Sequence, residues 1–76
     1  MELKPGDRVV VRRIVDDPGI LAPQRCLTPR RAGAQGVVSM PVHLDFNHPV
    51  PGQYYVRQDG DYVAYLDQEL LPLPPP

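Results

Sequence analysis

The stretch YYVRQDGDYVAY, residues 54–65, decides the fold class because it has the pattern of a β-hairpin. Asp59 and Gly60 stand between two arms that are rich in tyrosine and valine. An Asp-Gly pair favours a type I′ turn, whose two central residues need positive φ and whose twist matches that of the paired strands. The sequence therefore predicts that residues 54–58 pair antiparallel with residues 61–66.

The remainder of the chain predicts further short strands and no long helix. Eleven prolines are spread along the 76 residues, and each proline removes a backbone donor and clashes with the preceding helical turn. Alternating valines predict strands over residues 8–14 and 37–40, and residues 41–53 predict about five residues of strand followed by a Pro-Val-Pro-Gly breaker. Residues 66–70 have the length of one 3₁₀ turn, and residues 71–73 predict a brief closing strand.

Residues 15–32, between the first two predicted strands, contain three prolines and several apolar residues. This composition predicts an ordered excursion, with a short paired segment near residues 25–28, rather than a regular element. We expect residues 1–73 to form a single domain and residues 74–76 to be a polyproline tail.

The core predicted from this pattern is small, because a chain of this length removes only about 60% of its unfolded surface from water. Its expected members are the apolar residues that alternate along the predicted strands and the closing turn: Leu3, Val9, Val11, Ile14, Val38, Val42, Leu44, Val56, Ala64, Leu66, Leu70 and Leu71.

The order of these segments resembles an SH3-like small β-barrel. The resemblance is carried by GDRVVV at residues 6–11, GAQGVV at residues 33–38, the hairpin on QDGD and the terminal LDQELLPL. Similar ground plans occur in KOW nucleic-acid modules, the variable chain of ferredoxin-thioredoxin reductase and the β-subunit barrel of nitrile hydratase. The resemblance implies an all-β barrel of five short antiparallel strands, with a long irregular loop after the first strand and a 3₁₀ turn before the last. It also implies an accessory role, because in several of these families the barrel binds a catalytic subunit.

Charge and cysteine content indicate the cellular compartment in which the protein is expected. The net charge is −1; residues 1–38 have an excess of basic residues and residues 39–76 an excess of acidic ones, and we expect opposite charges to meet across strands. Cys26 is the single cysteine, no leader pattern is visible, and no apolar run approaches the roughly 20 residues that span a bilayer. The sequence therefore predicts a cytoplasmic protein without a membrane segment.

One group of residues could bind a metal ion, and one cysteine could be a reactive thiol. His43, Asp45 and His48 are potential zinc ligands, but their spacing matches no known signature, so we expect exposed polar positions and no metal or other cofactor. Cys26 follows Arg25 and is either a reactive thiol or, as we favour, a small buried residue that holds the excursion in place. No catalytic triad or phosphate-binding glycine loop is present, so we expect no catalysis by this chain alone.

Both arms of the hairpin carry apolar or aromatic residues on both faces, whereas a sheet with one solvated face alternates apolar with polar residues. Tyrosine and arginine are also enriched at the centres of protein interfaces. The sequence therefore predicts a contact patch for a protein partner, or for self-association, formed by Tyr55, Arg57, Val63 and Tyr65, with the excursion as a neighbouring contact region.

Two alternatives remain open. A KOW-like nucleic-acid-binding domain would use Arg12, Arg13, Arg30 and Arg31, although a pI near 6.0 lacks the usual basic footprint. A weaker alternative is an enzyme whose site forms between copies of the barrel.

Overall fold

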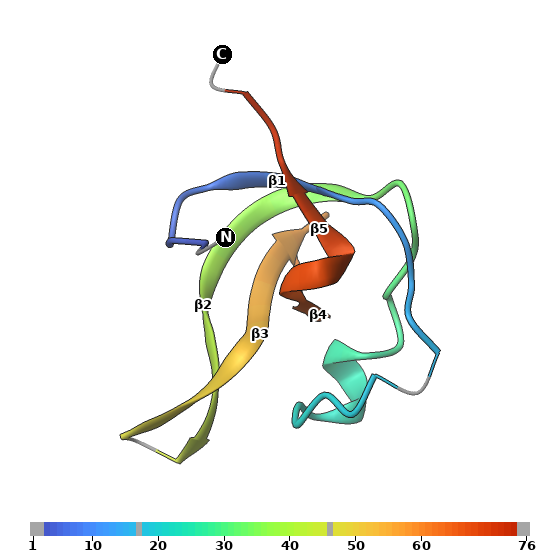
Figure 1. Ribbon diagram of the computed structural model, residues 1–76. Coiled ribbons are helices and arrows are strands. Elements are labelled where there is room, and N and C mark those ends of the chain that lie inside the picture. Colours follow the sequence, from blue (N-terminus) through green and yellow to red (C-terminus); the bar gives the residue numbers. More distant parts are fainter. Residues whose placement is uncertain (1–2, 17, 46, 75–76) are drawn as a thin grey trace.

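A single antiparallel sheet organises the chain (Figure 1). The computed structural model describes residues 3–16, 18–45 and 47–74. Its elements are β1 (Arg8–Val11), η1 (Gln24–Cys26), β2 (Gln35–Asp45), β3 (His48–Gln58), β4 (Asp61–Leu66), η2 (Asp67–Glu69) and β5 (Leu70–Pro72), where η denotes a 3₁₀ turn. The strand order in the sheet is β4-β3-β2-β1-β5.

The predicted all-β class is confirmed, with five antiparallel strands, an irregular excursion after β1 and a 3₁₀ turn before β5. The predicted closure into a barrel is not found. Strands β4 and β5 are the two edges of the sheet and do not pair with each other. The short paired segment expected near residues 25–28 is instead the 3₁₀ turn η1. Pro75 and Pro76 of the predicted tail lie outside the described residues.

The β3–β4 hairpin has the predicted turn and register. Asp59 and Gly60 both have positive φ, 50° and 83°, as a type I′ turn requires. Gln58 pairs with Asp61, and the register continues to Gln53 opposite Leu66.

The Pro-Val-Pro-Gly segment does not break the sheet, contrary to the prediction. It lies inside β3, and β2 and β3 remain paired as far as Asp45 opposite His48, with register shifts along the way. Strand β4 pairs with β3 only from Gln53 onward. The absence of a backbone N–H at Pro49 and Pro51 therefore removes no hydrogen bond to β4. The far end of the β2–β3 hairpin consequently projects away from the rest of the domain (Figure 1).

The core has two parts, one on each face of the sheet. We call the face that carries Val56 and Val63 the inner face and the face that carries Tyr55 and Ala64 the outer face. The inner cluster consists of Leu3, Val9, Val11, Ala34, Val38, Val56, Val63, Tyr65 and Leu70. The outer cluster consists of Cys26, Val42 and Ala64, with Ile20, Ala22, Leu27, Val50 and Tyr55 packed against it. The excursion, residues 15–32, thus covers part of the outer face with its own apolar side chains.

A β-bulge in β2 explains how one strand serves both clusters. Val38 pairs with Val56 but Met40 pairs with Tyr55, so Ser39 is an extra residue on β2. An inserted residue reverses the alternation of side chains beyond it. Val38 therefore belongs to the inner cluster, and Val42 belongs to the outer one.

Three residues of the predicted core are exposed instead: Ile14 at 40%, Leu44 at 69% and Leu71 at 43%. Strand β1 ends at Val11, so Ile14 lies beyond it. Leu44 follows the bulge and lies on the projecting hairpin, and Leu71 shares the outer face with its cross-strand partner Val10. Leu66 is only half-buried. The remaining eight members of the predicted core are buried.

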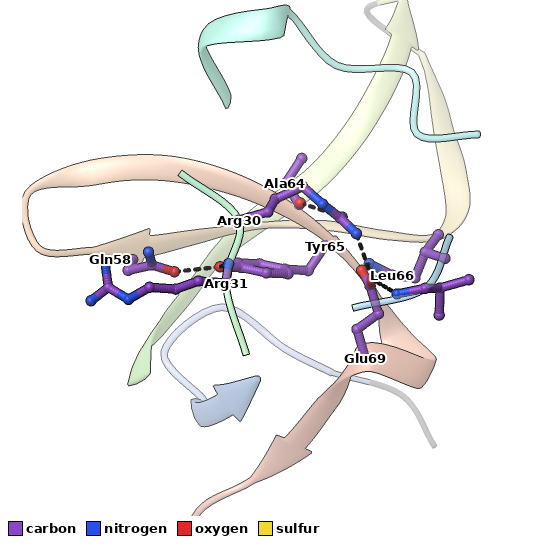
Figure 2. A network of polar contacts seen from close by, with 8 residues as sticks. Arg30, Arg31, Gln58, Ala64, Tyr65, Leu66 and Glu69 are labelled. Carbon is purple, nitrogen blue, oxygen red and sulfur yellow. Dashed lines mark hydrogen bonds and ion pairs between the residues drawn. The ribbon is translucent and has the colours of Figure 1, made fainter. Parts of the chain in front are cut away.

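A buried ion pair fixes the excursion to the sheet (Figure 2). Arg30 Nη2 lies 2.5 Å from Glu69 Oε2, and the two side chains are 7% and 0% exposed. The Glu69 carboxylate also accepts hydrogen bonds from the amides of Val15 and Leu66, each at 2.8 Å. Arg30 Nη1 donates to the Ala64 carbonyl at 2.9 Å. Both charges are therefore hydrogen-bonded as well as paired, which is the condition under which burial of charge is tolerated.

Tyr65 extends this network into the inner cluster (Figure 2). The Arg30 guanidinium lies 5.3 Å from the centre of the Tyr65 ring, and the Tyr65 hydroxyl donates to Gln58 Oε1 at 2.5 Å. Gln58 in turn donates to the Pro29 carbonyl at 3.1 Å. Burial raises the pKa of the Tyr65 hydroxyl, and the backbone hydrogen bond from Arg31 partly opposes this effect.

The first prediction tests the facing of β1. Val11→Asp should destabilise the protein by about 3 to 5 kcal/mol, because it places an unpaired charge in the inner cluster. Ile14→Asp should cost less than about 1 kcal/mol, because Ile14 lies at the surface. Urea denaturation of both variants measures the difference, and equal stability of the two would show that the facing is wrong.

The second prediction concerns the ion pair. Glu69→Gln should cost about 3 to 5 kcal/mol, since it leaves the Arg30 charge buried without a carboxylate. Arg31→Gln removes the exposed pair between Arg31 and Asp59 and should cost less than about 1 kcal/mol. Chemical denaturation at neutral pH compares them, and a Glu69→Gln variant as stable as Arg31→Gln would contradict the assignment.

The third prediction concerns pH. The pKa of Tyr65 is raised in the folded state above its ordinary value of 10.0, so its contribution to stability is present below that value and is lost as the pH rises through the folded pKa. Tyr65→Phe should cost about 1 to 3 kcal/mol at neutral pH. The difference between wild type and variant should shrink above pH 10, and a constant difference across this range would contradict the prediction.

Candidate protein-interaction surface

A row of four exposed side chains crosses the outer face of the sheet. Arg8 in β1 pairs with Val37 in β2, Val37 pairs with Arg57 in β3, and Arg57 pairs with Tyr62 in β4. Residues directly opposite one another in antiparallel strands project from the same face. We call Arg8, Val37, Arg57 and Tyr62 the outer row; all four are exposed.

A groove lies beside the outer row, between the sheet and the excursion. It has a volume of about 260 Å³ and is lined by Pro23, Arg25, Cys26, Met40, Tyr55 and Tyr62; we call it the excursion groove. A second hollow of about 240 Å³ shares Arg25, Cys26 and Tyr62 with it and extends to Gly60 and Asp61. Tyr62 therefore belongs to both the outer row and the excursion groove.

The wall of the groove is held in place by hydrogen bonds from the excursion to the sheet. The buried Gln53 side chain accepts from the Leu21 amide at 2.9 Å and donates to the Gly19 carbonyl at 3.3 Å. The Arg30–Glu69 pair fixes the other end of the excursion. Both walls are therefore held before any partner binds, which lowers the entropic cost of binding.

This surface is cationic as well as apolar. Among the described residues, the ion pairs are Arg30–Glu69, Arg31–Asp59 and His48–Asp45, so none of them uses Arg8, Arg25 or Arg57. Burial raises the pKa of the Tyr55 hydroxyl, and the nearby charge of Arg25 acts in the opposite direction. Asp61 is the acidic residue among those that line the second hollow.

The structure divides the predicted contact patch between the two faces. Tyr55 and Arg57 lie on the outer face, half-buried and exposed respectively. Val63 and Tyr65 have no exposed surface and belong to the inner cluster, so these two side chains are not available at the surface. The hairpin is apolar on both sides because the chain fills both of its faces: the inner cluster lies on one side and the excursion covers part of the other.

Four residues of this surface were not predicted from the sequence: Arg8, Val37, Met40 and Tyr62. Arg25 was predicted only as part of the contact region formed by residues 15–32. Tyr62 could have been found, because the type I′ turn places it opposite Arg57. Met40 could not, since the bulge at Ser39 determines its face. The position of Arg25 beside the groove depends on the path of the excursion, and the sequence of this segment has no hydrophobic periodicity from which that path could be predicted.

The four arginines of the nucleic-acid alternative differ in their surroundings. Arg30 is buried against Glu69, and Arg31 is paired with Asp59 at 2.9 Å. Arg12 and Arg13 are exposed beyond the end of β1. Arg30 is therefore not available to a phosphate group.

The potential zinc ligands lie on the projecting hairpin. His48 Nδ1 is 2.5 Å from Asp45 Oδ1, and this contact holds the pKa of Asp45 below its ordinary value. His43 Nδ1 contacts the Pro41 carbonyl instead, at 2.8 Å. Across residues 3–16, 18–45 and 47–74, no three His, Cys, Asp or Glu side chains gather as a metal site would require. Cys26 is buried in the outer cluster.

No family model, curated protein or solved structure matches this chain. In the part of the chain that the structure describes, no helix has the length and apolar character needed to cross a membrane. The outer row and the excursion groove are therefore the features that indicate a functional site.

Proposed function

We propose that this protein is a non-catalytic interaction module that binds a protein partner through the outer row and the excursion groove. The observation that carries the proposal is the presence of two exposed apolar side chains, Met40 at 46% and Tyr62 at 51%, in the lining of the excursion groove. A third, Val37 at 39%, lies in the outer row. Exposed apolar side chains that occur singly are ordinary, whereas a group of them around a hollow is typical of an interaction site.

The composition of the surface supports the same role. Tyrosine, methionine and arginine are the residues in which interface centres are enriched, and the excursion groove contains Met40, Tyr55, Tyr62 and Arg25. A bound side chain in the groove would contact two tyrosine rings, and the arginines around it could pair with groups at the rim. Tyr55 and Arg57 of the predicted contact patch remain part of this surface.

The resemblance of residues 6–11 and 33–38 to SH3-like barrels also supports the proposal. In several families of that type the barrel is an accessory that binds a catalytic subunit. A 76-residue chain with a partly apolar surface suits such a role, because the contact residues that lie on the sheet are positioned more accurately than residues on a mobile loop.

The fourth prediction tests this function by quantitative capture of partners on immobilised protein. Met40→Ser combined with Tyr62→Ser should reduce recovery of a specific partner by more than about tenfold, because truncation of buried interface residues costs about 1 to 2 kcal/mol each. Leu21→Ser combined with Leu44→Ser is the matched control, because these residues are also exposed and apolar but do not line the groove.

The control double variant should retain the partner, and both variants should keep the thermal midpoint of the wild type. A partner retained by the Met40 and Tyr62 variant, or lost equally with the control, would contradict the proposed function.

A further inference from the structure

Three arginines surround the apolar part of the outer face. Arg8 and Arg57 belong to the outer row, and Arg25 lines both the excursion groove and the second hollow. Within the described part of the chain none of the three takes part in an ion pair. The protein as a whole has a net charge of −1, so this face is positive against an acidic average.

Building on the proposed function, we infer that the partner presents an extended acidic segment, whose carboxylates pair with Arg8, Arg25 and Arg57 and whose apolar side chain occupies the excursion groove. Guanidinium groups bind carboxylates through two parallel hydrogen bonds, which gives both affinity and a defined orientation. One acidic residue, Asp61, also lines the second hollow.

The spacing of the outer row suits an extended peptide. Neighbouring strands are about 4.8 Å apart, so Arg8 and Arg57, which lie two strands apart, are separated by about 10 Å at their backbones. Side chains on one side of an extended chain recur every 6 to 7 Å or so. Flexible arginine side chains can therefore reach carboxylates two to three residues apart, and Val37 lies between them as an apolar floor.

The groove favours a peptide over a nucleic acid. Its volume of about 260 Å³ is below the roughly 300 Å³ at which sites for whole small ligands begin, and it suits a single apolar side chain. Binding of single-stranded nucleic acid uses a series of exposed rings along a continuous basic path. Here Tyr62 is half-exposed but Tyr55 is held against the outer cluster, so the face offers no series of exposed rings.

The fifth prediction tests the acidic chemistry by fluorescence anisotropy with defined probes. The probe is a labelled peptide of about twelve residues, long enough to cross the sheet, with mostly Asp and Glu residues and two Phe residues. The matched peptide has Asn and Gln in place of the acids, and a thymidine oligonucleotide of similar length is the third probe. We expect the acidic peptide to bind and to weaken as the salt rises through about 0.15 M.

Arg25→Glu and Arg57→Glu should each weaken binding of the acidic peptide by more than about tenfold, because each replaces an attraction with a repulsion. Arg13→Glu changes the net charge equally at an exposed position beyond the end of β1 that lines neither hollow, and it should change affinity by less than about twofold. This control separates binding at the face from attraction by net charge alone.

Each other result has a distinct meaning. Equal binding of the neutral peptide, or failure of the acidic peptide while the capture experiment succeeds, would overturn the acidic chemistry and leave the proposed function standing. Equal loss in Arg13→Glu would show attraction by net charge alone and would likewise overturn the inference. Binding of the oligonucleotide in place of the peptide, lost in Arg57→Glu, would overturn both.

Discussion

The Arg30–Glu69 ion pair is the interaction on which the rest of the structure depends. The sheet is open, so the β4 edge needs partners that a neighbouring strand would otherwise supply. Arg30 provides one to the Ala64 carbonyl, and Glu69 provides one to the Leu66 amide. The same carboxylate binds the Val15 amide at the start of the excursion. One buried pair therefore satisfies two backbone groups at the β4 edge and fixes the excursion against it.

Attachment of the excursion has a direct consequence for function. It allows so short a chain to bury side chains on both faces of its sheet, in the inner and outer clusters. Cover of the outer face is incomplete, and the uncovered remainder is the outer row together with the excursion groove. The surface that we propose for a partner is thus the part of the outer face that the chain does not cover itself. This surface is partly apolar because it shares side chains with the outer cluster: Tyr55 and Cys26 belong to the cluster and also line the groove.

Features that depend on residues close together in the sequence, such as the β3–β4 turn and its hairpin register, were predicted correctly. Asp59 and Gly60 specify the turn and hence the register of β3 and β4, and the short segment after Leu66 forms the expected 3₁₀ turn and final strand. Features that depend on contacts between residues far apart in the sequence were not predicted. The bulge at Ser39 depends on how β2 curves, and Arg30 and Glu69 are distant in sequence, with no pattern that pairs them. The division of the predicted contact patch, by contrast, follows from the hairpin register alone. The turn at Asp59 and Gly60 places Tyr55 opposite Ala64, so Val63 lies on the other face of the sheet.

Native-state hydrogen exchange of the Val15 and Leu66 amides tests the central claim most directly. Both donate to the Glu69 carboxylate, yet they come from the excursion and from the sheet edge. If the ion pair joins these parts into one cooperative unit, both amides should exchange only through global unfolding, at the same free energy as the amide of Val38 in the sheet. Rapid exchange of Val15 while Val38 stays protected would show that the excursion opens independently, and would contradict the account of the fold and of the groove that depends on it.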